Sequence, residues 1–403
     1  VLELLTGIIP YAKHSEFPFE IDIYIDGKIF PLSEVKENIL ANKQIYSKNN
    51  YFDLRLYLSL NKNLINTFKK SSPPVIFYLL KGKYITLKDK IWNKIRKASI
   101  RYARNKIGSY DLIHLTMPCY FKTLTSDKPK FLTTVHDLTH LYFPDFHTSK
   151  NIISTEKGLK YSIRKKSHFI TVSNSTRNDL LKEYKIDAQK VKVIYEAADN
   201  STFRRLYQED CAKIIKRKYN LPPTPYFLSL CTLEPRKNII NTIRAFLLLE
   251  KENPDLEINL VIAGRKGWKI EDLFQDQSIK SNKIIFSGFI EEQDLSTIYN
   301  SAIALLYASY YEGFGLPPLE SMSCGTPVIY GNNSSLKEII GEAGLACQPD
   351  DIYDIKEKMK LLIDDKQLRE DKSKLSMQRA SDFSWEKSVR ETLNYYQEIL
   401  ENN

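Results

Sequence analysis

Short runs of β-branched and aromatic residues alternate with helical patterns along the whole chain, and no other feature limits the possible folds so strongly. Such alternation is typical of strand–helix–strand units, which assemble into parallel sheets covered by helices. In the first half, strands are predicted at Phe19–Ile25, Asp111–Met117, Phe131–Val135, His168–Ser173 and Lys192–Glu196. In the second half, strands are predicted at Tyr226–Cys231, Ile258–Ala263, Ile284–Phe289, Ala302–Ser309, Pro327–Tyr330 and Gly344–Gln348. We therefore expect an α/β protein with two parallel sheets.

A length of 403 residues is enough for two domains or at most three, each with its own core. The polar segment Asp199–Pro225 separates the two sets of strands and ends in three prolines, so we place the linker there. We predict a first domain of residues 1–205, a second of residues 206–381, and a C-terminal helix at 382–403 that packs back on the first domain.

The start of the chain is unusual for a domain of this kind. Val1 is not a methionine, and Val1–Lys13 reads as a helix where a strand and a glycine loop are expected. A secretory signal does not fit, because Glu3 interrupts the apolar stretch and no basic leader or small-residue cleavage site is present. We expect residues before Val1, including the first strand, to be missing.

The net charge of +10 indicates an anionic partner, and most of the excess lies in one stretch. Ten Lys and Arg residues between Lys81 and Lys106 are opposed by Asp89 alone. Within it, Lys88–Ile107 has the pattern of a basic amphipathic helix. Such a helix is suited either to lie on an anionic membrane or to pack on the domain with its cations in water, and the sequence leaves both open. It contains no nucleic-acid-binding motif, so we expect no nucleic-acid partner.

Several classes of protein are excluded by composition and motifs. No apolar run approaches the 18 residues of a membrane span. Five cysteines without a Cys-x-x-Cys pair argue against a disulfide framework and against a cysteine-based zinc site. The chain has no Asp-x-Asp, HExxH or GxGxxG motif, so neither a carboxylate-held metal nor a dehydrogenase-type dinucleotide site is predicted. We expect a cytoplasmic protein, with peripheral contact at the inner face of the plasma membrane if the basic helix binds lipid.

The strongest motif is the segment Tyr311–Glu320, directly after the apolar run Ala302–Ser309. Pro317 and Pro318 predict a helix from about Pro317 to Cys324, so the segment is a loop that leads into a helix N-terminus and favours an anion. We expect Gly313 and Gly315 to leave backbone N–H groups open to a ligand.

Two glutamates flank this loop, Glu312 at the predicted strand end and Glu320 in the predicted first helical turn. Carboxylates accept hydrogen bonds from vicinal hydroxyls, so Glu312 suits a sugar and Glu320 a ribose. For either glutamate taken alone, a structural explanation is favoured, with Glu320 as a partner of the helix dipole and the glycines as turn formers.

The second motif is Thr232–Asn238, between the predicted strand Tyr226–Cys231 and an apolar helix that Asn238 would cap. Arg236 and Lys237 stand where a sheet edge meets a helix N-terminus, the usual place for a diphosphate in an open α/β domain. Taken alone, adjacent basic loop residues are more often only solvated. Gly264 lies in a similar but weaker segment after the next predicted strand, which a simple turn would also explain.

The third motif is Val135–Leu138, which places His136 at the carboxyl end of a strand of the first domain. A histidine there can reach a crevice between two domains, although a single histidine is more often structural.

Together these motifs resemble the retaining, nucleotide-sugar-dependent glycosyltransferases of the GT-B fold, glycosyltransferase family 4 or group 1, which include glycogen synthases and phosphatidylinositol mannosyltransferases. The resemblance covers roughly His114 to the C-terminus and is strongest from Tyr226 to Pro349. It implies two Rossmann-like parallel-sheet domains facing across a cleft. The family's glutamate pair, separated by seven residues, corresponds to Glu312 and Glu320.

The resemblance also implies roles for individual residues. It implies that His136 and Glu312 are catalytic. It implies that the donor is bound by Arg236, Lys237, Gly264, Gly313, Phe314, Gly315, Leu316 and Glu320. This chain departs from many relatives at Cys231 and Thr232, where they have Gly-Arg, and it lacks the N-terminal glycine loop.

The amino-acid sequences of the motifs are similar to those of bacterial mannosyl- and rhamnosyltransferases that build O-antigen or capsule chains. This implies transfer of a hexose, with mannose or rhamnose favoured, from a nucleoside-diphosphate sugar, with a GDP-sugar favoured. The acceptor would be a glycan or lipid-linked glycan, the anomeric configuration would be retained, and no metal or cofactor would be needed. The alternatives are a GT-B sugar-nucleotide epimerase, a hydrolase-like activity, and a non-catalytic GT-B domain of a larger glycan-assembly protein.

Overall fold

The computed structural model describes residues 22–25, 28–31, 110–120, 129–206, 213, 217–222, 224–267 and 281–401. The predicted helices Val1–Lys13 and Lys88–Ile107 lie outside these residues. The chain forms two compact units. One comprises Val1–Ile113, Phe121–Lys130 and Tyr396–Asn403, and the other comprises His114–Tyr120 and Phe131–Tyr395. The second unit holds all of the site described below, and the domain boundaries given above stay predictions.

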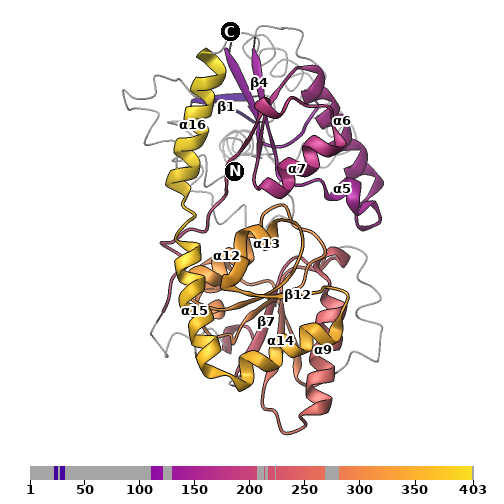
Figure 1. Ribbon diagram of the computed structural model, residues 1–403, viewed down its shortest axis with the longest axis vertical. Coiled ribbons are helices and arrows are strands. Elements are labelled where there is room, and N and C mark those ends of the chain that lie inside the picture. Colours follow the sequence, from indigo (N-terminus) through magenta and orange to yellow (C-terminus); the bar gives the residue numbers. More distant parts are fainter. Residues whose placement is uncertain are drawn as a thin grey trace, which may run out of the picture. The chain divides into compact units, whose positions relative to one another are not determined.

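The larger sheet has six strands, each paired in parallel with its neighbours (Figure 1). They are β7 (Tyr226–Leu230), β8 (Asn259–Ala263), β9 (Ile284–Gly288), β10 (Leu305–Tyr307), β11 (Val328–Gly331) and β12 (Leu345–Cys347). Each lies within a few residues of a strand predicted above, so the predicted second sheet is confirmed.

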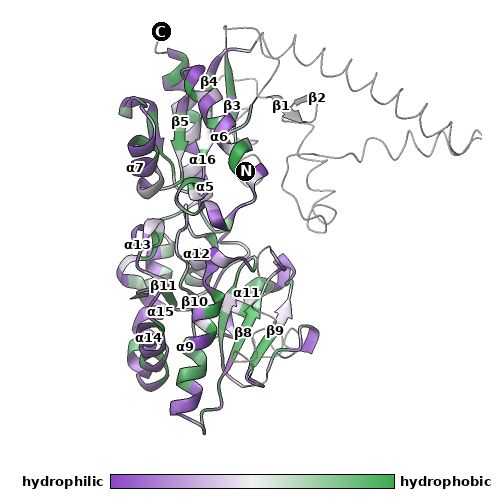
Figure 2. Ribbon diagram, turned by 90° about the vertical axis from the view of Figure 1, so that its right-hand side faces the viewer, coloured by the Kyte–Doolittle hydropathy of each residue, from purple (hydrophilic) through white to green (hydrophobic). Residues whose placement is uncertain are grey.

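Side-chain alternation along the strands of this sheet gives it two apolar faces, because successive residues of a strand point to opposite sides. In β8, Leu260 and Ile262 join one buried cluster while Val261 and Ala263 join the other. The first cluster is covered by α9 (Ile239–Glu252) and α14 (Ile352–Asp364). The second is covered by α11 (Glu292–Asn300), α12 (Leu316–Ser323) and α13 (Ser334–Ile340). Figure 2 shows β8 as hydrophobic and α14 as largely hydrophilic on its outer side.

The order of the six strands is β12-β11-β10-β7-β8-β9. The chain therefore builds outward from β7 through β8 to β9, and then returns to the other side of β7 with β10. At such a reversal the loops after the two central strands diverge and leave a crevice at their carboxyl ends. The loops concerned follow β7 and β10, and they carry the two strongest sequence motifs.

The smaller sheet has the order β3-β4-β5-β6, and its last three strands are parallel. Its strands are β3 (Leu112–Leu115), β4 (Lys130–Val135), β5 (His168–Thr171) and β6 (Val191–Val193). The helices α5 (Thr139–Tyr142), α6 (Ser149–Arg164) and α7 (Asn174–Glu183) follow β4 and β5. After α15 (Lys366–Ala380) the chain ends in α16 (Trp385–Glu401), in which the Tyr395 hydroxyl donates to the Lys190 carbonyl at 2.9 Å.

One predicted strand is assigned to the wrong sheet. β1 (Asp22–Ile25) lies within the predicted strand Phe19–Ile25, but it pairs antiparallel with β2 (Lys28–Pro31) and not with the parallel sheet. The physical reason is local, because the sequence between them is Asp26-Gly27, a dipeptide that favours a two-residue hairpin turn. That signal was available in the sequence.

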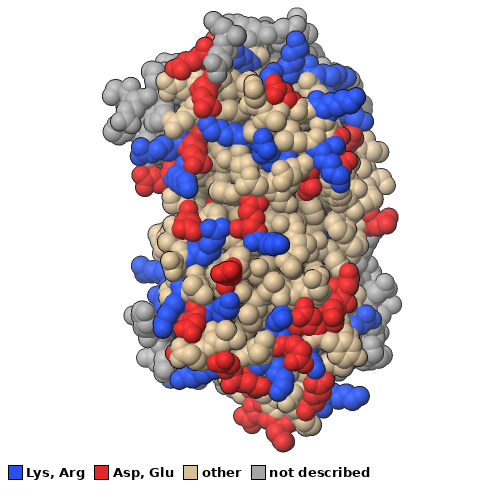
Figure 3. All heavy atoms as spheres, in the orientation of Figure 1, with Lys and Arg blue, Asp and Glu red and all other residues tan. Residues whose placement is uncertain are grey.

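Charged residues on the face of the molecule shown in Figure 3 are of both signs and interspersed. The basic stretch from Lys81 to Lys106 lies outside the described residues. In the described part of the chain, no helix combines the length and the apolar content that crossing a bilayer requires.

Candidate active site

A cavity of about 480 Å³ opens where the loops after β7 and β10 meet the loops of the smaller sheet. It is lined by His136, Asp137, Val172, Glu196, Cys231, Thr232, Glu234, Arg236, Lys237, Tyr307, Glu312, Gly313, Phe314, Gly315, Leu316 and Pro317. Its residues thus come from the carboxyl ends of strands in both sheets, where α/β proteins usually bind ligands.

The loop after β10 delivers Glu312 to this cavity and then enters α12. Gly315 sits at the N-cap of α12 with φ +113°, a left-handed conformation that favours glycine. The helix begins at Leu316, one residue earlier than predicted. Glu320 is consequently its fifth residue, so the prediction that it lies in the first turn is wrong.

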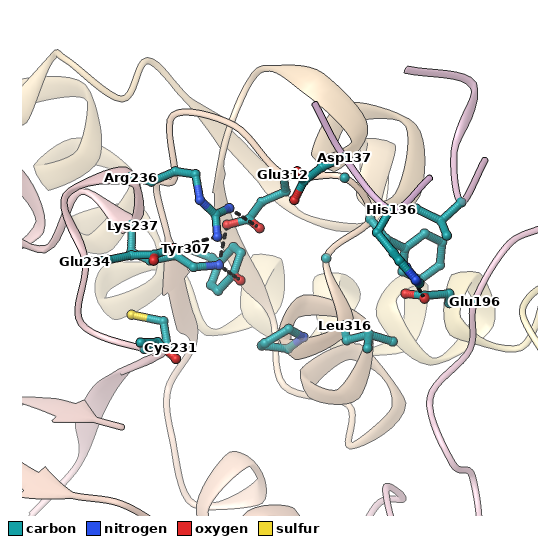
Figure 4. Close-up of a pocket in the computed structure, with 16 residues that line it drawn as sticks. His136, Asp137, Glu196, Cys231, Glu234, Arg236, Lys237, Tyr307, Glu312 and Leu316 are labelled. Carbon is teal, nitrogen blue, oxygen red and sulfur yellow. Dashed lines mark hydrogen bonds and ion pairs between the residues drawn. The ribbon is translucent and has the colours of Figure 1, made fainter. Parts of the chain in front are cut away.

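Glu312 is held by ion pairs with two neighbouring cations, Arg236 and Lys237 (Figure 4). One carboxylate oxygen of Glu312 accepts a hydrogen bond from Arg236 at 2.7 Å, and the other accepts one from the Lys237 ammonium at 2.6 Å. Arg236 also donates to Glu234 at 2.6 Å, and Lys237 donates to the Tyr307 hydroxyl at 2.8 Å. Glu312, which was predicted to face the sugar, is therefore paired directly with Arg236 and Lys237, which were predicted to face the diphosphate.

The charge states of Glu312 and Arg236 follow from this geometry. Burial alone would raise the pKa of Glu312, but the charges and hydrogen bonds of Lys237 and Arg236 outweigh burial and lower it to about 2. Burial likewise opposes the charge on Arg236, yet Glu312 and Glu234 raise the pKa of the guanidinium. Glu312 is therefore an anion and Arg236 a cation at neutral pH. An arriving diphosphate would meet cations that already have a carboxylate partner.

Asn238 fixes the loop that carries the two cations, but not as predicted. It occupies the N-cap position of α9 in a left-handed conformation, φ 56° and ψ 38°, and its side chain makes no capping hydrogen bond. The side-chain amide instead donates to the carbonyls of Ala308 at 3.0 Å and Pro349 at 2.7 Å. It therefore ties the loop after β7 to the chain that leaves β10. The predicted N-cap position of Asn238 is confirmed, whereas its side chain makes no capping hydrogen bond.

Gly313 marks the closest approach between the two sets of loops. A Cβ atom at this position would lie 1.9 Å from the His136 carbonyl oxygen, which no side chain could accept. The Gly313 carbonyl in turn accepts hydrogen bonds from the hydroxyls of Ser173 at 2.7 Å and Thr176 at 3.3 Å. Glycine is needed here because the backbones pack against each other.

His136 lies on the opposite side of the cavity from Glu312 and its cations, and its ring is engaged at both nitrogens (Figure 4). Nδ1 is 3.2 Å from Oε1 of Glu196, and Nε2 is 3.1 Å from the Thr116 carbonyl oxygen. Burial alone would lower the pKa of His136, but the hydrogen bond and charge of Glu196 more than compensate, and the pKa is raised. The loops of the smaller sheet thus present a histidine–carboxylate pair to the cavity.

Not every predicted residue lines the cavity. His136, Arg236, Lys237, Glu312, Gly313, Phe314, Gly315 and Leu316 do, whereas Gly264 and Glu320 do not. A Cβ at Gly264 would lie 1.7 Å from the Cys231 carbonyl oxygen, so this glycine lets the loops after β7 and β8 pack together. Glu320 accepts a hydrogen bond from the Tyr299 hydroxyl at 2.8 Å, and burial raises its pKa to about 7.

Among the lining residues that the sequence did not assign to the site, Glu196, Glu234 and Tyr307 each contact an assigned residue. Glu196 ends a predicted strand, and Glu234 stands within a motif already singled out, so both positions carried a signal. Tyr307 read only as an apolar strand residue, although its hydroxyl contacts Lys237. In the described part of the chain, no three His, Cys, Asp or Glu side chains are grouped as a metal site would require.

Solved structures share this arrangement of elements. Sucrose-phosphate synthase from Thermosynechococcus elongatus superimposes with a TM-score of 0.60 at 21% identity, covering 76% of this chain and 77% of that one. The Anabaena protein HepE, in complex with UDP and glucose, superimposes with a TM-score of 0.61 at 16% identity, covering 74% and 81%. These likenesses show a common fold, the GT-B fold of two parallel-sheet α/β domains.

Sequence relatives give the family. The profile described as "Glycosyl transferases group 1" matches residues 212–378, and that described as "Glycosyltransferase Family 4" matches residues 62–201. O-antigen chain mannosyltransferase B of Escherichia coli is 32% identical over 267 residues, 66% of this chain and 69% of that protein. O-antigen chain mannosyltransferase RfbU of Salmonella typhimurium is 30% identical over 220 residues, 54% and 56%. The chain therefore belongs to glycosyltransferase family 4, the group 1 glycosyltransferases, and is an enzyme of the GT-B fold.

Proposed function

We propose that this glycosyltransferase moves a hexose, with mannose favoured over rhamnose, from a nucleoside-diphosphate sugar to a glycan or lipid-linked glycan in cell-surface polysaccharide synthesis. The observation that carries the proposal is the meeting of Arg236, Lys237 and Glu312 in one cavity with His136 across it. The choice of mannose and of an O-antigen chain is supported by the names of the two bacterial relatives at 32% and 30% identity, and the choice of a GDP-sugar follows from the resemblance described in the sequence analysis.

The residues of the larger sheet are proposed to stabilise the negative charge that develops on the leaving diphosphate. Breaking the bond between the anomeric carbon and the phosphate oxygen develops negative charge on the diphosphate, which Arg236 and Lys237 can offset with fixed positive charge. The diphosphate would take the place of the Glu312 carboxylate at these cations. Glu312 would then be free to accept hydrogen bonds from hydroxyls of the transferred sugar.

The proposed step retains the anomeric configuration. The acceptor hydroxyl attacks the anomeric carbon on the face from which the diphosphate leaves, and its proton passes to the departing phosphate oxygen. The new carbon–oxygen bond replaces the old one, so atoms and charge balance without a covalent enzyme intermediate. His136 supports the reacting face from the first domain. Because the cations come from side chains, we propose that the reaction needs no metal.

Other roles extend from this assignment. Gly313, Phe314, Gly315 and Leu316 would surround the donor at the entrance to α12. Glu320 and Gly264 do not line the cavity, so they would support the nucleotide end only from beside it. Membrane contact through Lys88–Ile107 and residence at the inner face of the plasma membrane remain part of the proposal.

The first experiment is thermal unfolding of the protein with GDP, UDP, ADP and dTDP in turn. A nucleotide present at 100 times its dissociation constant adds about 2.7 kcal/mol to the free energy of unfolding. We expect one nucleotide, GDP, to stabilise the wild type and to lose most of that effect in Lys237→Ala. The control is Lys360→Ala on α14, whose ammonium lies on the surface beside Asp364.

Turnover is then tested with the matching sugar nucleotide and a mannan-type acceptor, with and without EDTA. A product with the donor's anomeric configuration, formed equally in EDTA, supports the proposal. No stabilisation by any nucleotide, or stabilisation that Lys237→Ala leaves intact, contradicts the donor site.

A further inference from the structure

His136 lies between two groups that can only accept hydrogen bonds. Its Nδ1 faces a Glu196 carboxylate oxygen at 3.2 Å, and its Nε2 faces the Thr116 carbonyl oxygen at 3.1 Å. Neither oxygen carries a proton at neutral pH, and a neutral imidazole has a single N–H. Both contacts are hydrogen bonds only when the ring is doubly protonated. The geometry therefore selects the imidazolium.

Within the described residues, the other titratable groups around the ring agree with this assignment. His114 of β3 accepts or donates at the Thr134 hydroxyl at 2.7 Å, and burial together with the neighbouring His136 lowers its pKa to about 3. His114 is thus neutral. The Asp137 carboxylate accepts from the Thr139 backbone and hydroxyl at 3.1 and 2.7 Å. From the second sheet, Gly313 presents only backbone to His136.

Among the described residues, Glu196 is therefore the carboxylate that is paired with His136. It is partly buried, with 17% of its side chain exposed, so its charge is only weakly screened by water. Burial opposes its ionisation, but the hydrogen bond and charge of His136 lower the pKa of Glu196. Each partner thus stabilises the charged form of the other.

We propose that Glu196 is a positioning residue that holds His136 as an imidazolium at the first-domain wall of the cavity. The proposal rests on the transferase function given above. The imidazolium of His136 gives the cavity a positive charge on the side of the smaller sheet, opposite Arg236 and Lys237. When a donor binds, Nε2–H can exchange the Thr116 carbonyl for a donor oxygen while Nδ1–H stays on Glu196.

The test is Glu196→Gln, which keeps an oxygen that can accept from Nδ1–H and removes the negative charge. Because a raised pKa keeps His136 charged until the pH exceeds it, losing Glu196 moves the loss of charge to lower pH. We expect kcat of Glu196→Gln to be within about twofold of wild type at pH 6 and on the order of tenfold lower at pH 8.5. Glu196→Asp, which restores the charge, should recover most of the loss.

The second readout needs no turnover. The ring C–H resonance of His136, assigned by its disappearance in His136→Gln, is followed by NMR against pH, and in Glu196→Gln its titration should move to lower pH. The control is Glu156→Gln, which removes the carboxylate 3.6 Å from Nε2 of His140, a histidine that does not line the cavity. It should change neither the pH profile of kcat nor the His136 titration.

The outcomes separate this inference from the proposed function. A pH-independent loss of kcat with an unchanged His136 titration overturns the inference and leaves the transferase intact. A shifted titration with an unchanged pH profile shows a pair that does not serve the reaction, which also overturns it. If the wild type transfers no sugar, the proposed function fails, and the NMR titration alone decides whether Glu196 holds the imidazolium.

Discussion

Glu312 is bound by a different cation at each carboxylate oxygen, and this double pairing gives the residue two separable tasks. In the structure it neutralises Arg236 and Lys237, which are partly buried. In the proposed reaction it orients the sugar. Removing one member of a buried charge set generally leaves its partners uncompensated, at a cost of about 3–5 kcal/mol when the partner is fully buried.

We expect Glu312→Gln to remain folded but to lose kcat by at least about two orders of magnitude, since an amide orients hydroxyls less strongly than a carboxylate does. Its affinity for the nucleoside diphosphate should be unchanged or higher, because the phosphates no longer compete with a carboxylate. Turnover assays and nucleotide titration by calorimetry measure the two effects. Glu370→Gln, an exposed glutamate of α15, is the control. Near-normal turnover would remove Glu312 from the proposed mechanism.

At the scale of elements, hydrogen bonds from two helices hold the loop from β10 to α12. The Ser335 hydroxyl of α13 donates to the carbonyls of Glu312 and Phe314 at 2.8 and 2.9 Å. Ser173, at the N-cap of α7, donates to the Gly313 carbonyl. The loop is therefore fixed before any ligand arrives, and its position depends on the contact between Gly313 and His136.

Gly313→Ala should separate that contact, because the new methyl group meets a backbone oxygen that cannot move like a side chain. We expect a loss of about 1–3 kcal/mol in the free energy of unfolding and a large fall in kcat. Gly288→Ala is the matched control, since its φ of +73° is strained for alanine but nothing lies within 4 Å of the added Cβ. Denaturant unfolding and turnover assays compare the two. Equal loss of kcat in both variants would contradict the steric argument.

The elements themselves were largely predictable, and the reasons differ between residues. In β8 the four residues after Asn259 are apolar without alternation, which is typical of a strand buried on both faces. β2 lies outside the predicted strands, although Asp26-Gly27 directly before it is a typical hairpin-turn sequence. Site residues such as Glu312 were predictable because they stand in the same short motif as the glycines and prolines that mark the start of a helix. Glu196 is 60 residues from His136 in sequence, and only the order β4-β5-β6 brings the two strand ends together.

At the scale of the whole molecule, Glu320 makes stability depend on pH. Its folded pKa of about 7 lies above its ordinary value of 4.5, so between these two values the folded state binds more protons than the unfolded state. Stability from this group therefore falls as the pH rises from 4.5 to 7 and is then constant. The pKa of Glu320 is raised mainly by burial, with the charge of Glu292 adding to the shift and the hydrogen bond from Tyr299 opposing it.

The measurement is the free energy of unfolding of wild type and Glu320→Gln at about pH 4.5, 6, 7.5 and 8.5. We expect the wild type to lose stability relative to the variant between pH 4.5 and 7, and the difference to stay level above pH 7. Glu370→Gln serves as the control for removing a surface charge. Parallel curves for wild type and Glu320→Gln at all of these values would show that Glu320 ionises normally in the folded protein.

The pairing of Arg236 and Lys237 with Glu312 also bears on inhibition. A competitive inhibitor that offers only an anion must displace a carboxylate that is covalently tethered and already in place. A better inhibitor would carry an anion that binds Arg236 and Lys237, together with a hydroxyl or amide group that donates a hydrogen bond to the displaced Glu312 carboxylate. Selectivity for this enzyme would then come from spanning the cavity to reach the His136–Glu196 pair.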